Sequence, residues 1–193
     1  MNLKSIIGAA LLVYGALSAI GAGSAQASEG ATEPARPLTT IASLDVQRYL
    51  GTWYEIAKYP NQFQKKCAAA TRADYSQLAN GRLSVVNRCT TQDGLTSEAI
   101  GEARQTGSAT SPKLQVRFAP AWLSFIPMVW GNYWVIDLDP NYQVAAISEP
   151  TREYLWVLAR SPEISPKTYA DLTARLEKMG FDLQKLVRTP HAK

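Results

Sequence analysis

Trp53 and Arg160 have the residue types needed for a cation–π contact, although they lie far apart in the chain. An arginine guanidinium can stack on the flat face of an indole, and such a contact contributes ~0.5–2 kcal/mol. Gly51 stands two positions before Trp53 and supplies a tight backbone entry into a strand. The segments between the two residues follow each other at the spacing of an antiparallel meander, which gives this short pattern weight.

The only two cysteines, Cys67 and Cys89, allow two interpretations. In an oxidising compartment an even count favours a disulfide, which would close a loop of about 20 residues and contribute about 3 kcal/mol. A two-residue hairpin at Asn80-Gly81 would set Arg72 opposite Cys89, so the bridge requires that Cys67 curl back or that the strand contain a bulge. The alternative is a free Cys67 that acts as a nucleophile.

Residues for other catalytic or metal chemistry are scarce. A reactive thiolate usually needs a nearby base, and the only histidine, His191, lies in the C-terminal tail. The same scarcity argues against haem ligation and against a histidine-based zinc site. The sequence contains neither a phosphate-binding loop nor a serine nucleophile elbow. We therefore expect a protein that is not an enzyme, with no metal and no cofactor.

Residues 1–27 have the pattern of an export signal. Lys4 gives a positive start, 6–17 is apolar, and Ala25-Gln26-Ala27 is a small-residue cleavage site. The alternative is a retained membrane anchor, because the apolar stretch carries no charge. Neither cysteine lies near the cleavage site, so no residue is available for lipidation of the processed N-terminus. We expect an exported, periplasmic protein, either soluble or peripheral to the outer membrane.

The rest of the chain has the length of one domain with a sizeable core. Residues 28–40 are small, polar and proline-bearing, and we expect a flexible leader there. The folded domain is then expected over 41–193. The formal net charge of +4 falls to +3 when Lys4 is removed, which is too small and too scattered to indicate a nucleic-acid partner. The sequence leaves the oligomeric state open.

Strand-like segments dominate the predicted domain, and turn signals such as Asn80-Gly81 separate them. The eight expected strands are 52–59, 68–78, 82–89, 97–106, 113–118, 132–137, 143–148 and 154–160. Eight sequential strands can close into an all-β, antiparallel, up-and-down barrel wide enough for one small ligand. A helix over 165–179, with Ser165 as its N-cap, presents an apolar stripe and should pack outside the barrel.

Three motifs in this order make the chain resemble the lipocalins, and most closely the bacterial lipocalins related to apolipoprotein D. The motifs are YLGTWYEIAK at 49–58, DLDPNY at 137–142 and YLWVLARSP at 154–162. Many lipocalins carry Thr-Asp-Tyr in the second motif, whereas this chain has Leu138 and Pro140 beside Asp139. The resemblance covers about 45–189. It implies that Trp53 and Arg160, with Gly51, close one end of the barrel in a structural role.

A barrel closed at one end forms a cup whose lining comes from one face of each strand. The candidate ligand-binding residues are Tyr133, Trp156, Val135, Leu158, Ala57, Tyr75 and Val85. The resemblance favours Tyr133 and Trp156 in particular, while core packing is the alternative role for each residue. Each buried methylene contributes ~0.8 kcal/mol, so an acyl chain suits such a cup. Polar tips from Tyr133, Tyr75 or Glu55 could contact a head group.

The segment 119–130 is unusually apolar for a connection between two strands, because it carries no charge. Its large side chains include Trp122, Phe125, Met128 and Trp130. We expect this loop at the open mouth, in contact with ligand or with a membrane surface. The alternative is that it folds back as a lid or packs on the barrel.

Together these features predict a protein that binds and transports or stores a fatty acid, a lysophospholipid or a similar amphiphile in the cell envelope. Two other functions stay open at this point. One is a lipid-modifying isomerase that uses Cys67, and the other is an envelope interaction protein that needs no lipid.

Overall fold

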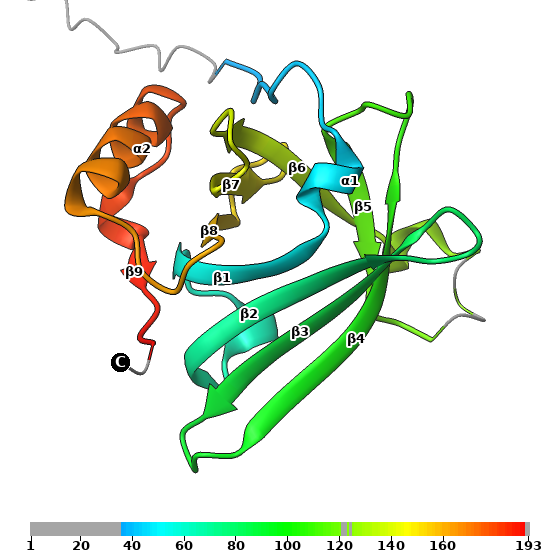
Figure 1. Ribbon diagram of the computed structural model, residues 1–193, viewed down its shortest axis with the longest axis horizontal. Helices are drawn as coiled ribbons and strands as arrows, with labels where there is room; N and C mark the ends of the chain where they lie inside the picture. Colours follow the sequence, from blue (N-terminus) through cyan, green and yellow to red (C-terminus); the bar gives the residue numbers. More distant parts are fainter. Residues whose placement is uncertain (1–35, 121–122, 124, 192–193) are drawn as a thin grey trace, which may run out of the picture. The chain divides into compact units, whose positions relative to one another are not determined.

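Figure 1 shows the computed structural model of the chain. The structure describes residues 36–120, 123 and 125–191, and all of these belong to one compact unit. The predicted signal peptide and most of the predicted leader lie outside the described residues. The last leader residues run beside the barrel, where Leu38 is buried in the core.

Eight antiparallel strands form a closed barrel, which confirms the predicted fold class. The strands are β1 (Gly51–Lys58), β2 (Cys67–Gln77), β3 (Leu83–Thr91), β4 (Thr96–Gln105), β5 (Lys113–Arg117), β6 (Gly131–Leu138), β7 (Val144–Ser148) and β8 (Leu155–Ala159). Each strand pairs with the next in sequence. Strand β1 pairs with both β8 and β2, so the ladder closes on itself.

Short helices and one further strand complete the described residues. They are α1 (Val46–Tyr49), η1 (Gln62–Gln64), η3 (Pro127–Val129), α2 (Pro166–Lys178), η4 (Leu183–Lys185) and β9 (Val187–Arg188), where η denotes a 3₁₀-helix. Helix α2 begins as predicted, with the Ser165 side chain accepting from the Thr168 amide. Gly180, with φ +87°, follows its C-terminus. No helix within the described ranges combines the length and apolar character needed to cross a membrane.

Two separate apolar clusters form because alternate side chains of each strand face opposite sides of the barrel wall. The outer cluster joins α2 to the wall, and Leu172 and Leu176 of the helix are fully buried there. Figure 1 shows α2 standing beside the barrel, outside the strands. The inner cluster fills the lower barrel interior, where Trp53 and Val135 are fully buried.

The turn between β2 and β3 corrects one prediction. Gln77 pairs with Leu83, and the Leu78 amide donates to the Arg82 carbonyl at 2.8 Å, so three residues rather than two form the turn. Gly81 has φ +78°, as a three-residue hairpin with a left-handed last residue requires. This register sets Arg72 opposite Arg88 instead of Cys89.

Cys67 and Cys89 form the predicted disulfide, with Cα atoms 5.5 Å apart. Register shifts between Cys67 and Ala69, and between Ala69 and Arg72, supply the bulges that the bridge requires. Since the chain contains only these two cysteines, no free thiol remains for an isomerase that uses Cys67.

The C-terminal tail completes the barrel wall between β1 and β2. Strand β9 pairs with Ala57 and Lys58, and the Thr189 amide donates to the Ile56 carbonyl. One residue later, the Pro190 carbonyl accepts from the Ala70 amide of β2. The tail therefore bridges the part of the wall where β1 and β2 no longer pair with each other.

Candidate functional site

Trp53 and Arg160 close one end of the barrel. The Arg160 guanidinium carbon lies 4.0 Å from the centroid of the Trp53 ring. Its Nη1 and Nη2 atoms donate to the carbonyls of Thr52 and Arg48 at 2.9 and 2.8 Å. Gly51 has φ +92°, and a Cβ at this position would lie 3.3 Å from Nη1 of Arg160. Glycine therefore provides both the backbone conformation and the space for the guanidinium.

Three tyrosine hydroxyls form a buried network directly above this base. Tyr49 stacks on Trp53 at 4.7 Å, and its hydroxyl lies 2.8 Å from that of Tyr133. The Tyr133 hydroxyl also lies 2.9 Å from that of Tyr75. Burial raises the pKa of Tyr75 to about 12 and raises those of Tyr49 and Tyr133 as well. All three phenols therefore stay neutral at physiological pH.

The network has one hydroxyl proton more than it uses. Three hydroxyls carry three protons, and the two hydrogen bonds among Tyr49, Tyr75 and Tyr133 use two of them. Among the described residues no other acceptor is bonded to these hydroxyls. The floor of the barrel can thus donate one hydrogen bond to a water molecule or to a polar atom of a ligand.

Above the floor, several inward-facing side chains are only half-buried. Tyr133, Trp156 and Val116 pack against the inner cluster and keep exposed surface. Asn87, opposite Ala73 and Ala99 on the same face, is half-buried too. Dense packing would bury these side chains completely. Their partial exposure agrees with the predicted cup in the upper barrel.

Six of the seven candidate lining residues lie in or against the inner cluster. They are Tyr75, Val85, Tyr133, Val135, Trp156 and Leu158. Ala57 differs from the expectation and lies in the outer cluster. A register shift between Glu55 and Ala57 reverses the alternation of β1, so that Ala57 faces α2 instead of the interior.

The same register shift creates a polar cluster near the mouth. The Glu55 side chain is 3% exposed, and its Oε1 lies 2.8 Å from Nζ of Lys58. Gln64 and Thr189 donate to the same carboxylate at 2.6 and 2.5 Å. The indole Nε1 of Trp156 in turn donates to Oε1 of Gln64 at 2.9 Å. The cluster thus fixes the Trp156 ring at the upper wall of the cup.

Sequence reasoning identified Glu55 as a polar tip but missed its three partners. Residues three apart in a regular strand point to opposite faces, so Glu55 and Lys58 gave no signal of contact. Thr189 comes from the tail, 134 residues later in the chain. Only the fold brings these residues together.

A row of aromatic rings leads from the surface to the cup. Phe63, which is mostly exposed, lies 5.5 Å from the Tyr154 ring. Tyr154 stacks on Trp156 at a centroid distance of 5.7 Å and an interplanar angle of 10°. An amphiphile that enters the barrel would meet an aromatic surface along this path.

The apolar loop 119–130 differs along its length. Phe125 and Met128 are 77% and 93% exposed, whereas Trp130 is only 6% exposed. Trp130 lies on the outer face of the barrel, with the Arg104 guanidinium carbon 4.1 Å from one of its ring centroids. Trp122 lies outside the described residues.

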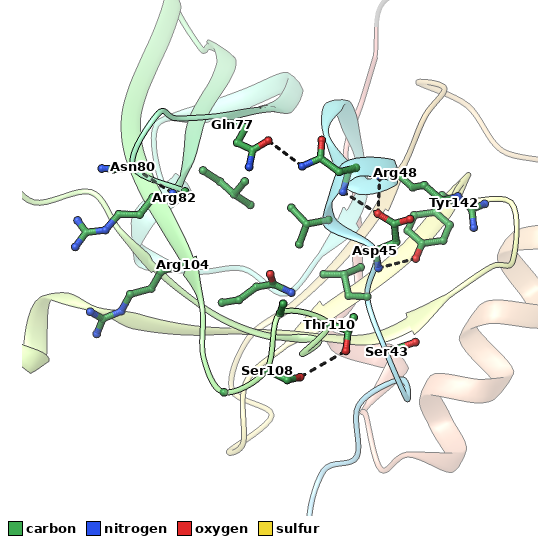
Figure 2. A pocket seen from close by; sticks show the side chains of 18 residues that line it. Ser43, Asp45, Arg48, Gln77, Asn80, Arg82, Arg104, Ser108, Thr110 and Tyr142 are labelled. Carbon is green, nitrogen blue, oxygen red and sulfur yellow. Dashed lines mark hydrogen bonds between the residues drawn. The ribbon is translucent and has the colours of Figure 1, made fainter.

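A second hollow, of about 870 Å³, lies outside the closed end of the barrel. Figure 2 shows its lining from α1 and the neighbouring turns, with Arg82 and Arg104 extending away from it. Its polar groups are engaged in structure, since Asp45 Oδ1 caps the Gln47 amide and Tyr142 accepts from the Asp45 amide. Two of its lining residues, Leu44 and Leu83, are buried in the inner cluster.

Metal chemistry finds no support within the described ranges. They contain no group of three or more histidine, cysteine, aspartate or glutamate residues that could hold an ion.

Comparison with known proteins agrees with this geometry. A family model described as "Lipocalin-like domain" matches residues 44–191. The chain is 38% identical to temperature-induced lipocalin-1 of Arabidopsis thaliana over 81% of this chain and 84% of the relative. It is 37% identical to outer membrane lipoprotein Blc of Escherichia coli, over 80% and 83% of the two chains.

Similarity extends to mouse apolipoprotein D, at 32% identity over 78% of each chain. Among solved structures, insecticyanin from the tobacco hornworm Manduca sexta superposes with a TM-score of 0.63 at 18% identity, covering 81% of this chain and 85% of that chain. At this identity the structural match supports the fold alone.

Proposed function

This chain belongs to the lipocalin-like domain family, and on that premise we propose that its barrel binds a fatty acid, a lysophospholipid or a similar amphiphile. The half-buried inner wall at Tyr133 and Trp156 carries the proposal, because it leaves surface for a ligand above a sealed floor. No residue set of the cup points to bond chemistry, so the proposed function is binding without turnover.

The acyl chain would occupy the cup between the tyrosine floor and the mouth. Ten buried methylenes contribute roughly 8 kcal/mol gross, on the order of micromolar affinity before ordering costs. The floor can donate one hydrogen bond, and the mouth presents Lys58 and Gln64 beside Trp156. We place the polar head of the ligand at the mouth, where it keeps access to water.

We further propose that the protein is exported and works in the cell envelope, in transport or storage of lipid. The predicted signal peptide supports export, and one relative is named an outer membrane lipoprotein. The exposed Phe125 and Met128 support peripheral contact of the loop 119–130 with a lipid surface.

The test of ligand binding compares two tryptophans on opposite faces of the wall. Trp156 packs against the inner cluster, whereas Trp134 packs against the outer cluster, with Lys113 over its ring. Isothermal titration calorimetry measures the affinity for palmitate and for lysophosphatidylcholine. The Trp156→Ala variant should bind both about 10-fold or more weakly than the unmodified protein, because a large apolar contact is lost.

The control variant Trp134→Ala should keep the affinity of the unmodified protein. Equal affinities of all three proteins would contradict the proposed site. Complete absence of lipid binding, also by native mass spectrometry of the purified protein, would favour the lipid-independent interaction protein instead.

A further inference from the structure

Three arginines surround the buried ring of Trp130 on the outer face of the barrel. The guanidinium carbons of Arg104, Arg117 and Arg82 lie 4.1, 5.2 and 5.7 Å from ring centroids of Trp130. Strands β3, β4 and β5 bring them together, since Leu83 pairs with Ala103 and Arg104 pairs with Gln115. We call these three residues the arginine cluster.

The cluster has more positive than negative charge. Glu102 is its one ion-pair partner among the described residues, at 2.9 Å from Arg82 and 3.1 Å from Arg117. Arg104 instead donates twice to the neutral amide oxygen of Gln115, at 2.8 and 3.2 Å. Three guanidinium groups against one carboxylate leave two positive charges uncompensated.

The indole holds the cluster in a fixed arrangement. Cation–π contacts orient each guanidinium, and the buried Trp130 supplies one ring to all three. A planar guanidinium can donate two parallel hydrogen bonds to a phosphate, and a group that is already ordered loses less entropy on binding. These properties favour phosphate groups presented at a surface.

The most exposed apolar side chains of the loop follow the same tryptophan closely. Met128 stands two positions before Trp130, within helix η3, whose carbonyl at Pro127 accepts from the Trp130 amide at 3.1 Å. Phe125 precedes this helix, and both apolar side chains are more than three-quarters exposed. Apolar side chains beside ordered cations match the two layers of a bilayer surface, acyl chains and charged head groups.

We infer that the arginine cluster, with Phe125 and Met128, docks the barrel onto membranes rich in anionic phospholipids. This inference rests on the proposed membrane contact of the loop and adds to it a preference for lipid charge. The two uncompensated charges attract the surface, and the apolar side chains enter the head-group region. An acidic protein would meet the same charges but would not require the two exposed apolar side chains.

The test measures sedimentation of the processed protein, without the predicted signal peptide, with vesicles of phosphatidylcholine, either alone or mixed with phosphatidylglycerol. The protein should partition onto the anionic vesicles and only weakly onto the neutral ones. Each basic residue near an anionic surface accounts for ~5-fold in affinity, so the double variant Arg82→Gln and Arg104→Gln should bind ~25-fold more weakly. Added salt should reduce the difference between the two proteins.

Two controls separate the contributions. The first control is a double variant, Lys167→Gln with Lys185→Gln, which removes the same charge from exposed positions in α2 and η4. It should bind the anionic vesicles as the unmodified protein does. Phe125→Ser with Met128→Ser should lower binding to both kinds of vesicle. Thermal unfolding checks that each variant is folded, and Arg104→Lys, which keeps the charge, should bind better than Arg104→Gln.

Equal partition onto neutral and anionic vesicles, or anionic binding unchanged by the arginine substitutions, overturns the inference. Palmitate affinity measured without vesicles reports on the cup alone. If the unmodified protein does not bind palmitate, the proposed ligand binding is contradicted. The vesicle measurement then still decides whether the arginine cluster docks onto anionic membranes.

Discussion

The two ends of the barrel use polar groups in different ways. At the closed end, Arg160 donates to the backbone carbonyls of Arg48, Thr52 and Tyr142 and lies over the buried Trp53 ring. Near the mouth, Glu55 and its partners bond almost entirely through side chains, and the aromatic rings above them keep exposed surface. The acceptors at the closed end are therefore fixed by the backbone, whereas those near the mouth depend on the positions of neighbouring side chains.

This difference indicates which end of the barrel stabilises the fold and which end would recognise a ligand. At the closed end, Trp53 and Arg160 donate to backbone carbonyls of their own chain, so this pair stabilises the fold. The mouth keeps half-exposed aromatic surface that a ligand would cover. A substitution at the closed end should therefore affect unfolding, and one at the mouth should affect affinity.

The largest expected effect comes from Trp53→Ala. Loss of the fully buried indole should lower the free energy of unfolding by about 3–5 kcal/mol, because a cavity remains and Arg160 loses its aromatic face. Urea denaturation measures this loss. Trp156→Ala is the matched change at the mouth and should cost less than half as much, since its ring is half-buried. Equal losses would remove the distinction between the two ends.

A smaller effect is expected from the disulfide, which joins the start of β2 to the end of β3. The bridge spans 22 residues, and its removal in Cys67→Ser with Cys89→Ser should lower the free energy of unfolding by about 3 kcal/mol. Urea denaturation of the double variant and of the unmodified protein measures this loss. The unmodified protein with its disulfide reduced should lose the same amount of free energy. The Trp53–Arg160 contact should be unaffected, so near-ultraviolet circular dichroism of the folded variant should stay unchanged. A changed signal would show that the two ends are coupled.

The smallest of the three effects is a loss of stability in alkali. The pKa of Tyr75 is about 12 in the folded chain because of burial, while an unfolded tyrosine titrates near 10. Stability should therefore be constant below about pH 10 and fall as pH rises from 10 to 12, because the folded state keeps a proton that the unfolded chain releases. At about 1.4 kcal/mol per pKa unit, Tyr75 accounts for somewhat under 3 kcal/mol.

Denaturation at a series of alkaline pH values tests this dependence, with Tyr75→Phe as the control that should reduce the slope. Stability that stays level through pH 12 would show that the tyrosine floor is open to solvent.

Regular features of the fold were predictable from local patterns. Alternating strands and turn signals predicted the eight strands, and Ser165 predicted the start of α2. The turn before β3 was predicted one residue too short, because Asn80-Gly81 suits both a two-residue turn and the end of a three-residue turn. The resulting error in register is one residue.

The site was less predictable because it depends on irregularities. The register shift in β1 moves Ala57 out of the inner wall and brings Lys58 to Glu55, and no sequence pattern marks its position. The arginine cluster assembles from three strands around Trp130, so its members show no common spacing in the chain. Sequence patterns describe neighbours along a strand, whereas these contacts cross strands.

The tail that bridges β1 and β2 has a consequence for biosynthesis. Thr189 reaches Glu55 across 134 residues, and the Pro190 carbonyl accepts a hydrogen bond from the Ala70 amide. A ribosome would have to release nearly the whole polypeptide before the wall could be completed. Until that moment the part of β1 beyond Tyr54 has one edge without a strand partner.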